Sequence, residues 1–235
     1  MTHNENVETT IITGDEMRPR EVERAELIDR LKTKFGIDEP IFTEEIITSW
    51  NEYSAPRVYQ LLREFCTDGT ITKYSYGVYF FQKIAFWGKP LSLSAEKVAK
   101  KRYMQNGDKI YGYYSGLTLF NMVGLTNQVP FVREIVTMNE TTRLRNVMIG
   151  GRRFRIRRAK TEITKENAPL FKILDIFSER PLKIERPLDR VQIENLIVIA
   201  GGGRIDSASL EECAKFFPKR ALQNLKRSEI GYLVA

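Results

Sequence analysis

Five arginines lie within the seven residues from Arg152 to Arg158, in the stretch GGRRFRIRRAK. A guanidinium group is charged at neutral pH and offers paired N–H donors that match the oxygens of a phosphate or a carboxylate. The whole chain of 235 residues also carries a formal net charge of +7. The chemistry that this stretch indicates is therefore the binding of an anion, with the phosphate backbone of a nucleic acid as the first candidate.

The residue types that build common catalytic and metal sites are scarce in this chain. The single histidine, His3, lies in the polar N-terminal segment, and Cys66 and Cys213 are far apart and have no CxxC partner. Catalytic triads, cysteine–histidine pairs and zinc sites need a placed histidine or a cysteine cluster. The acidic residues form no obvious metal motif, and no phosphate-binding glycine motif follows a strand. We therefore expect no catalytic site, no metal and no cofactor.

The charge of the chain is unevenly distributed. Residues 1–86 contain ten Lys or Arg and fifteen Asp or Glu, a net of −5, whereas residues 87–235 contain twenty-seven and fifteen, a net of +12. The change falls near FWGKPLSLS, where a glycine and a proline also interrupt regular structure. We therefore predict a disordered tail over 1–18, a first domain over 19–86 and a second domain over 87–235.

No segment of the sequence has the features of a membrane span or a secretory signal. The chain has no run of about 18 apolar residues, and its N-terminal residues contain no apolar core. Two isolated cysteines are typical of reduced thiols. We therefore expect a cytoplasmic protein without a membrane partner.

The order of patterns over 19–86 predicts a winged helix-turn-helix. Apolar residues at helical spacing, a short helix from Thr43 and a third helix from Ser54 are followed by two strand-forming runs around Gly77. In the third helix, one i, i+3, i+4, i+7 stripe is apolar, and it consists of Val58, Leu61, Leu62 and Phe65.

A winged helix-turn-helix places its third helix in the major groove and its hairpin beside the phosphates. The candidate DNA contacts on the helix are Ser54, Arg57, Gln60 and Arg63, and those on the wing are Lys73, Tyr74 and Tyr76. Arginine and glutamine suit base edges or phosphates, and the free N–H groups at the Ser54 end suit a phosphate. Winged helices also serve as protein-interaction modules, and a net charge of −5 is unusual for a DNA reader. Both interpretations remain open at this point.

The pattern over 87–235 predicts a mixed domain, so that the fold class is α+β. A helix begins near Ser94, a short strand and a helix cover 110–123, and FVREIVTMN is a strand. A Gly150-Gly151 turn then joins two strands in a tight hairpin. Helices follow in three apolar-patterned stretches and after Pro218, so the domain has a small sheet and C-terminal helices.

Alternation along the second strand of this hairpin separates its arginines from its apolar residues. Arg153, Arg155 and Arg157 share one face, and Phe154 and Ile156 share the other. We expect the row to be extended by two arginines of the preceding segment, Arg143 and Arg145. Three interpretations of the row remain open: a solvated face that also protects a sheet edge, a surface that contacts DNA phosphates, or a docking face for an acidic or RNA-bound partner.

The end of the wing, GVYFF, and the following YYSGLTLFNMVGLTNQVP, strand and hairpin resemble a known family. They are similar to the AbiEi-type antitoxins of type IV, abortive-infection toxin–antitoxin systems of phage defence, and to relatives of uncharacterised function. The resemblance covers roughly residues 20–160. Its motif is a packing signature, in which Ser115 caps a helix and Gly124 ends it.

This resemblance implies a DNA-binding antitoxin and transcriptional autorepressor. Its winged helix binds inverted repeats in its own promoter, with the recognition helix at Ser54–Phe65 and the wing at Thr70–Phe81. Its second domain neutralises a partner toxin that resembles a nucleotidyltransferase. The alternative is an interaction module that sequesters a partner without reading DNA.

Overall fold

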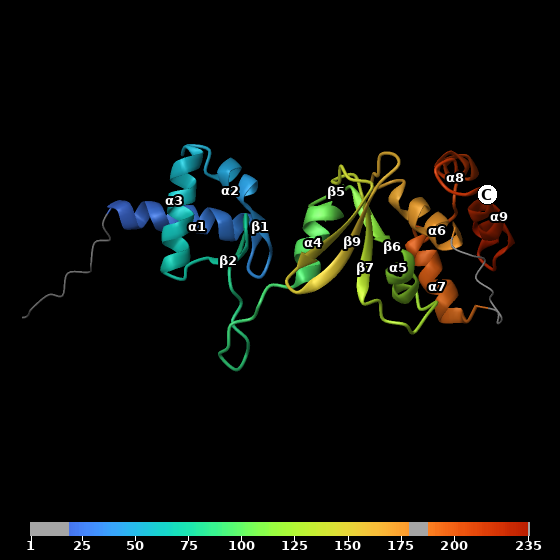
Figure 1. Ribbon diagram of the computed structural model, residues 1–235, viewed down its shortest axis with the longest axis horizontal. Helices are drawn as coiled ribbons and strands as arrows, with labels where there is room; N and C mark the ends of the chain where they lie inside the picture. The colour runs from blue at the N-terminus through green and yellow to red at the C-terminus, as the bar shows by residue number, and fades with distance from the viewer. Residues whose placement is uncertain (1–18, 179–187, 235) are drawn as a thin grey trace, which may run out of the picture. The chain divides into compact units, whose positions relative to one another are not determined.

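The computed structural model describes residues 19–178 and 188–234, which form a mixed α and β structure (Figure 1). The predicted tail, 1–18, lies outside the described residues. The chain divides into two compact units, Met1–Ser92 and Leu93–Ala235. This division lies within FWGKPLSLS but six residues after the predicted boundary.

The later boundary has a local cause, because the segment after the wing folds back on itself. Ala85 N donates to Lys89 O at 2.7 Å, and Leu91 N donates to Lys83 O at 2.8 Å. This small hairpin belongs to the first unit. Its tip exposes Phe86 fully and Trp87 by 69%, a feature that the sequence reading missed.

The first unit contains three helices and a small antiparallel sheet in the described residues. The sheet has the strand order β1-β3-β2, with Ile41 opposite Tyr79. The bounds are α1 Pro19–Phe35, β1 Ile41–Phe42, α2 Thr43–Ser49, α3 Ala55–Thr67, β2 Thr72–Ser75 and β3 Val78–Phe80. The predicted order of helices and hairpin is present. The structure also contains β1, which was not predicted because a strand of two residues is too short to show an alternating pattern.

The core of the first unit fixes the orientation of α3. The four residues of its predicted apolar stripe are between 0 and 3% exposed. Trp50 is also fully buried, and its ring centroid lies 6.0 Å from that of Phe65. Its indole N–H donates to Leu27 O at 3.2 Å, which anchors the end of α2 to α1. The opposite face of α3 is therefore held outward.

The second unit contains a four-stranded sheet with the order β6-β7-β9-β8. β7 runs parallel to β9, and the other neighbours are antiparallel. The sheet elements and their flanking helices are α4 Ala95–Tyr103, β6 Gly112–Ser115, α5 Gly116–Met122, β7 Val132–Thr137, β8 Leu144–Ile149, β9 Arg152–Arg158 and α6 Ala168–Ser178. The remaining elements are β4 Gln105–Asn106, β5 Lys109–Ile110, α7 Arg190–Ile199, α8 Ser207–Ala214, α9 Lys219–Arg227 and the 3-10 turn Gly231–Leu233.

The two-residue turn between β8 and β9 is formed as predicted. Gly150 and Gly151 have φ of 52° and 78°, and Ile149 is opposite Arg152. Positive φ at both central residues is the requirement of a type I′ hairpin, and glycine meets it without strain. β9 nevertheless lies between β7 and β8, so it is an interior strand. Of the three interpretations of the arginine row, the part that assigns it to the protection of a sheet edge is therefore excluded.

Helices lie on both faces of this sheet (Figure 1). α4 covers the face that carries Phe154 and Ile156, both fully buried. At Gly112 an added Cβ would come within 2.1 Å of the Tyr103 carbonyl oxygen, so only glycine allows the chain after α4 to pass so close to β6. α5 and α6 lie on the other face, where the C-terminal helices complete the core.

Candidate nucleic-acid interface

The N-terminal end of α3 is exposed at Ser54, the N-cap position. The Ser54 side chain makes no capping hydrogen bond. Backbone N–H groups of the first turn have no intrahelical partner, although Pro56 supplies none. This end of the helix can therefore accept a phosphate, with one donor fewer than an ordinary helix.

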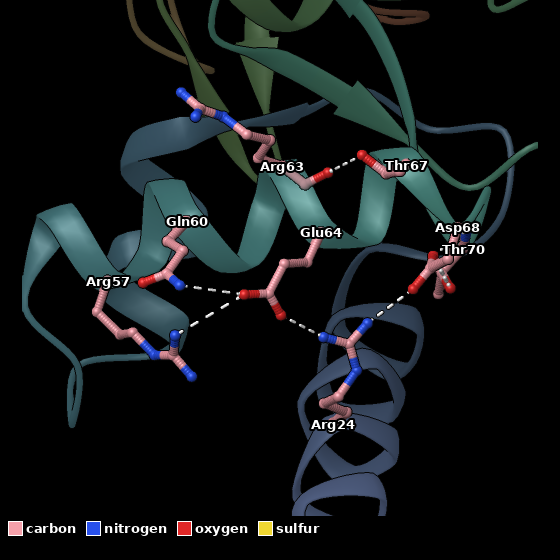
Figure 2. A network of polar contacts seen from close by, with 8 residues as sticks. All are labelled: Arg24, Arg57, Gln60, Arg63, Glu64, Thr67, Asp68 and Thr70. Carbon is pink, nitrogen blue, oxygen red and sulfur yellow. Dashed lines mark hydrogen bonds and ion pairs between the residues drawn. The ribbon is translucent and has the colours of Figure 1, made fainter.

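Arg57 and Gln60 are both held by the carboxylate of Glu64 (Figure 2). Gln60 Nε2 donates to Glu64 Oε1 at 3.3 Å, and Arg57 Nη1 lies 3.9 Å from the same oxygen. Arg24 of α1 donates to Glu64 Oε2 at 2.6 Å and to Asp68 Oδ2 at 2.7 Å. The two predicted contact residues therefore adjoin the Arg24–Glu64 ion pair between α1 and α3, while the Gln60 side chain remains exposed.

This network leaves the net charge of −5 over residues 1–86 unchanged, but it pairs the acids that lie beside α3. Arg24 and Arg57 balance Glu64 and Asp68, so the four side chains together carry no net charge. The Arg24 guanidinium also lies 4.3 Å from the centre of the Phe65 ring, which fixes its position by a cation–π contact. The acids nearest to α3 are therefore neutralised within the unit.

Arg63 points to the other side of α3 from Glu64 (Figure 2). It is exposed, and its guanidinium forms no hydrogen bond or ion pair with any residue that the structure describes. Tyr59, which the sequence reading did not select, is 51% exposed. At 100° per residue its side chain lies on the same outward half of the helix as Arg63. The helical period alone would have placed Tyr59 on this face.

The hairpin β2–β3 presents two of its three predicted contact residues. Lys73 is exposed, and Tyr76 at the turn is 91% exposed. Tyr74 is half-buried and lies at a β-bulge, because the register shifts between Lys73 and Ser75. Tyr74 therefore lies on the wing, on the less exposed side of β2 from Lys73.

The arginine row on β9 is paired with acids in two of its three positions. Arg155 Nη1 lies 3.6 Å from Glu134 Oε1 of β7, and Arg157 Nη2 lies 3.5 Å from Asp175 Oδ1 of α6. Their side chains are 44% and 48% exposed. Alternation along β9 is confirmed, but the row is less available for phosphates than its sequence indicates.

Arg153 differs from its two neighbours in the row. No described carboxylate lies within ion-pair distance of it, and its guanidinium lies 5.4 Å from the centre of the Phe131 ring. Phe131 is 81% exposed. Arg145 does not extend the row as expected, because it is opposite Ile156 on the other face and binds Glu140 Oε2 at 2.7 Å.

On the α4 side of the sheet, Glu96 binds two arginines. Its Oε1 lies 2.7 Å from Arg152 Nη1 and 3.1 Å from Arg133 Nε. Burial alone would raise the pKa of the Glu96 carboxyl, but hydrogen bonds from the backbone and Ser94, together with the two guanidinium charges, lower it. The ionised carboxylate therefore attaches the start of α4 to the sheet.

Replacing Glu96 by glutamine is expected to destabilise the second unit in a pH-dependent manner. Because folding lowers the pKa of this carboxyl, its contribution is complete above the unfolded pKa of about 4.3 and is lost as pH falls through the folded value. Urea unfolding followed by circular dichroism should show a loss of roughly 1 kcal/mol at pH 7. The difference between the two proteins should shrink below pH 4, and a constant difference would contradict the assignment.

Comparisons with known proteins leave the family of this chain undecided. No protein-family model matches it, and no curated protein is significantly similar to it. In the described part of the chain, no three His, Cys, Asp or Glu side chains are grouped as metal ligands. None of the helices over 19–178 and 188–234 is long and apolar enough to cross a membrane.

Proposed function

We propose that the first unit is a winged helix-turn-helix that binds duplex DNA through α3 and the β2–β3 hairpin. The observation that carries this proposal is the outward face of α3, where Arg63, Gln60 and Tyr59 are exposed opposite a buried apolar stripe. A helix that enters the major groove needs such a face on a rigid support. Lys73 and Tyr76 extend the surface onto the hairpin.

Arg63 is the residue best suited to read a base. Its five N–H donors are not used by any described side chain, so DNA binding would not break an existing ion pair. Arginine commonly donates two hydrogen bonds to guanine O6 and N7 in the major groove. Arg57 and Gln60 would first have to break their contacts with Glu64, so we assign them a smaller part in DNA binding than Arg63.

The proposal includes the role that the sequence resemblance implies. The protein is then a cytoplasmic, non-catalytic antitoxin of the AbiEi type that represses its own operon, and its operator contains inverted repeats. The test is fluorescence anisotropy of labelled duplexes at about 0.15 M salt. The upstream region of its own gene should bind at least tenfold more tightly than a random duplex of equal length. Equal affinity for the two duplexes would overturn DNA reading.

The Glu64→Gln variant is expected to bind random duplex DNA more tightly. It removes a negative charge beside the outward face and releases Arg57. A screened repulsion of about 0.7 kcal/mol at 6 Å corresponds to a gain of roughly threefold. The affinity is measured by anisotropy, with Glu52→Gln as the matched control because Glu52 pairs with Arg30 away from this network. An equal gain in the control, or none in Glu64→Gln, would contradict the proposed face.

A second candidate function concerns the second unit. Beside Arg153, the sheet face exposes Phe131 by 81%, Met148 by 60% and Leu144 by 53%. Met148 is opposite Arg153 and Leu144 is opposite Arg157, so these two residues share the face of the arginine row, and Phe131 adjoins it at Arg153. We propose that this face binds a protein with apolar and acidic residues at its contact surface. In the antitoxin interpretation, that protein is the nucleotidyltransferase-like toxin.

Co-purification with the product of the neighbouring gene tests this second function. The Met148→Asp variant should lose the partner, because it places a carboxylate in the apolar part of the face. Val198→Asp is the control, since Val198 on α7 is a 72% exposed apolar residue outside this face. Retention of the partner by Met148→Asp would overturn this docking surface while leaving DNA binding untouched.

A further inference from the structure

A cavity of about 260 Å³ lies in the second unit between the sheet and the C-terminal helices. Its walls come from β6, β7 and β9, from the segment 159–163, from α6 and from residues 216–220 around the start of α9. Pockets for drug-sized ligands usually begin near 300 Å³. A ligand of this cavity would therefore be small.

Tyr113 supplies an unused hydrogen-bond donor to the cavity. It is 4% exposed, yet its hydroxyl makes no hydrogen bond with any residue in the described ranges. Burial raises the pKa of this phenol well above its ordinary value, so the proton remains on the oxygen. The hydroxyl oxygen is not among the fully enclosed polar atoms that lack a partner, so it reaches the accessible surface of the cavity, where a ligand can accept its hydrogen bond.

A polar group of three side chains lies beside Tyr113, in which Ser115 and Asp175 are buried and Arg157 is exposed. Asp175 of α6 accepts hydrogen bonds from Ser115 Oγ and is 3.5 Å from Arg157 Nη2, which itself donates to Ser115 Oγ at 2.6 Å. Burial raises the pKa of the Asp175 carboxyl, and the hydrogen bonds and the Arg157 charge oppose that rise. Asp175 and Arg157 balance each other, so this group adds no net charge to the cavity.

Two further cations at the cavity form no ion pair with any carboxylate in the described part of the chain. Lys160 Nζ donates to the Phe216 carbonyl at 2.9 Å, and Arg220 Nε donates to the Ser178 carbonyl at 2.9 Å. Both acceptors are neutral and belong to cavity-lining residues. Lysine and arginine have further donors beyond those used here. The opening is therefore positively charged and has hydrogen-bond donors available.

The remaining wall is aromatic. The Phe171 ring centroid lies 5.8 Å from Phe217, 6.4 Å from Phe216 and 6.5 Å from Tyr113. Phe216 and Phe217 are only half-buried, so part of their surface is available to a ligand. Tilted and edge-to-face contacts between rings are favourable.

We propose that this cavity binds a small aromatic anion, in which one ring carries a phosphate or a carboxylate. The ring packs against the phenylalanines, and the oxyanion accepts hydrogen bonds from Tyr113 and from the cations of Arg157, Lys160 and Arg220. The inference is independent of DNA binding, because every residue that carries it lies in the second unit.

Four probes, each titrated into the full chain, test the contributions of the aromatic ring and of the negative charge separately. Phenyl phosphate and benzoate each combine a ring with an oxyanion, inorganic phosphate lacks the ring, and benzyl alcohol lacks the charge. Isothermal titration calorimetry should show that phenyl phosphate or benzoate binds at least tenfold more tightly than either partial probe. Preference between phenyl phosphate and benzoate identifies the head group. If neither exceeds both partial probes, the proposal is overturned.

Two variants connect the binding to the cavity. Tyr113→Phe removes a hydroxyl that has no described protein partner, so the unfolding midpoint should stay unchanged while affinity for the anionic probe falls about tenfold. Tyr103→Phe is the matched control, since Tyr103 is equally buried on the α4 side of the sheet, where its hydroxyl accepts from Arg145. Unchanged affinity in Tyr113→Phe would overturn the site.

Charge at the opening is tested separately. Lys160→Ala and Arg220→Ala should each weaken the anionic probe by about tenfold and leave benzyl alcohol unaffected. Arg204→Ala, at an exposed position outside the cavity, controls for the overall charge of the chain. An equal loss in Arg204→Ala would show general electrostatic attraction and would overturn the assignment to the cavity.

Discussion

Replacing Arg63 by alanine is expected to abolish the preference for one or two base pairs in the DNA site. A bidentate arginine–guanine contact discriminates against other bases by about 1–3 kcal/mol, which corresponds to roughly five- to 150-fold. Arg63 is exposed on the outward face of α3, and its donors are unused among the described residues. No internal ion pair is lost, so the fold of the unit should persist.

Selection from a random duplex library measures this effect. The wild-type protein should enrich a motif, and Arg63→Ala should enrich the same motif with one or two positions degenerate. Arg204→Ala removes an equal charge from the second unit and should leave the motif intact. Uniform weakening of all sequences by Arg63→Ala would identify a phosphate contact instead. Arg57→Ala should have the smaller effect, because Arg57 begins in an ion pair with Glu64.

The largest change in stability is expected from Phe154→Ala. Phe154 is fully buried in the interior strand β9, on the face of the sheet that α4 covers. Truncating a buried phenylalanine removes its transfer free energy and leaves a cavity, at a cost of about 3–5 kcal/mol. Arg153→Ala is the matched control at the adjacent position, whose side chain lies on the opposite, exposed face.

The distribution of tryptophan allows the two units to be followed separately. The chain has two tryptophans, Trp50 and Trp87, and both belong to the first unit. In a Trp87→Phe background, fluorescence of the buried Trp50 reports only the first unit, whereas circular dichroism reports both. Urea should unfold the Phe154→Ala second unit earlier, with the Trp50 transition unchanged. A loss below 1 kcal/mol would contradict the packing described for Phe154.

The sequence predicted local structure most reliably where one face of an element is continuously buried. The stripe on α3 and the alternation on β9 were both predicted and are both present. Helical and strand periods are local properties of the backbone, so such patterns require no knowledge of the partner element. The Gly150-Gly151 turn was predicted for a similar reason, since the positive φ angles that it requires depend only on the two residues of the turn.

Contacts between residues that are far apart in the sequence could not be predicted from local sequence patterns. Nothing in the third helix indicates that Arg24, forty residues before Glu64, binds its carboxylate. The strand order likewise depends on long-range pairing, and it places β9 inside the sheet, which excludes edge protection from the interpretations left open for the arginine row. The cavity at Tyr113 assembles residues from five regions of the chain, and no motif links them.

By itself, then, the sequence determined which residues of α3 and β9 face outward and where the charge of the chain is concentrated. The tertiary structure alone decided which of those charges remain available. Arg63 lacks an ion partner in the described structure, whereas Arg155 and Arg157 of β9 lie beside carboxylates of β7 and α6 that folding brings close. The physical reason is that a side chain's orientation follows the local backbone period, while its electrostatic neighbours depend on packing between elements that are far apart in the chain.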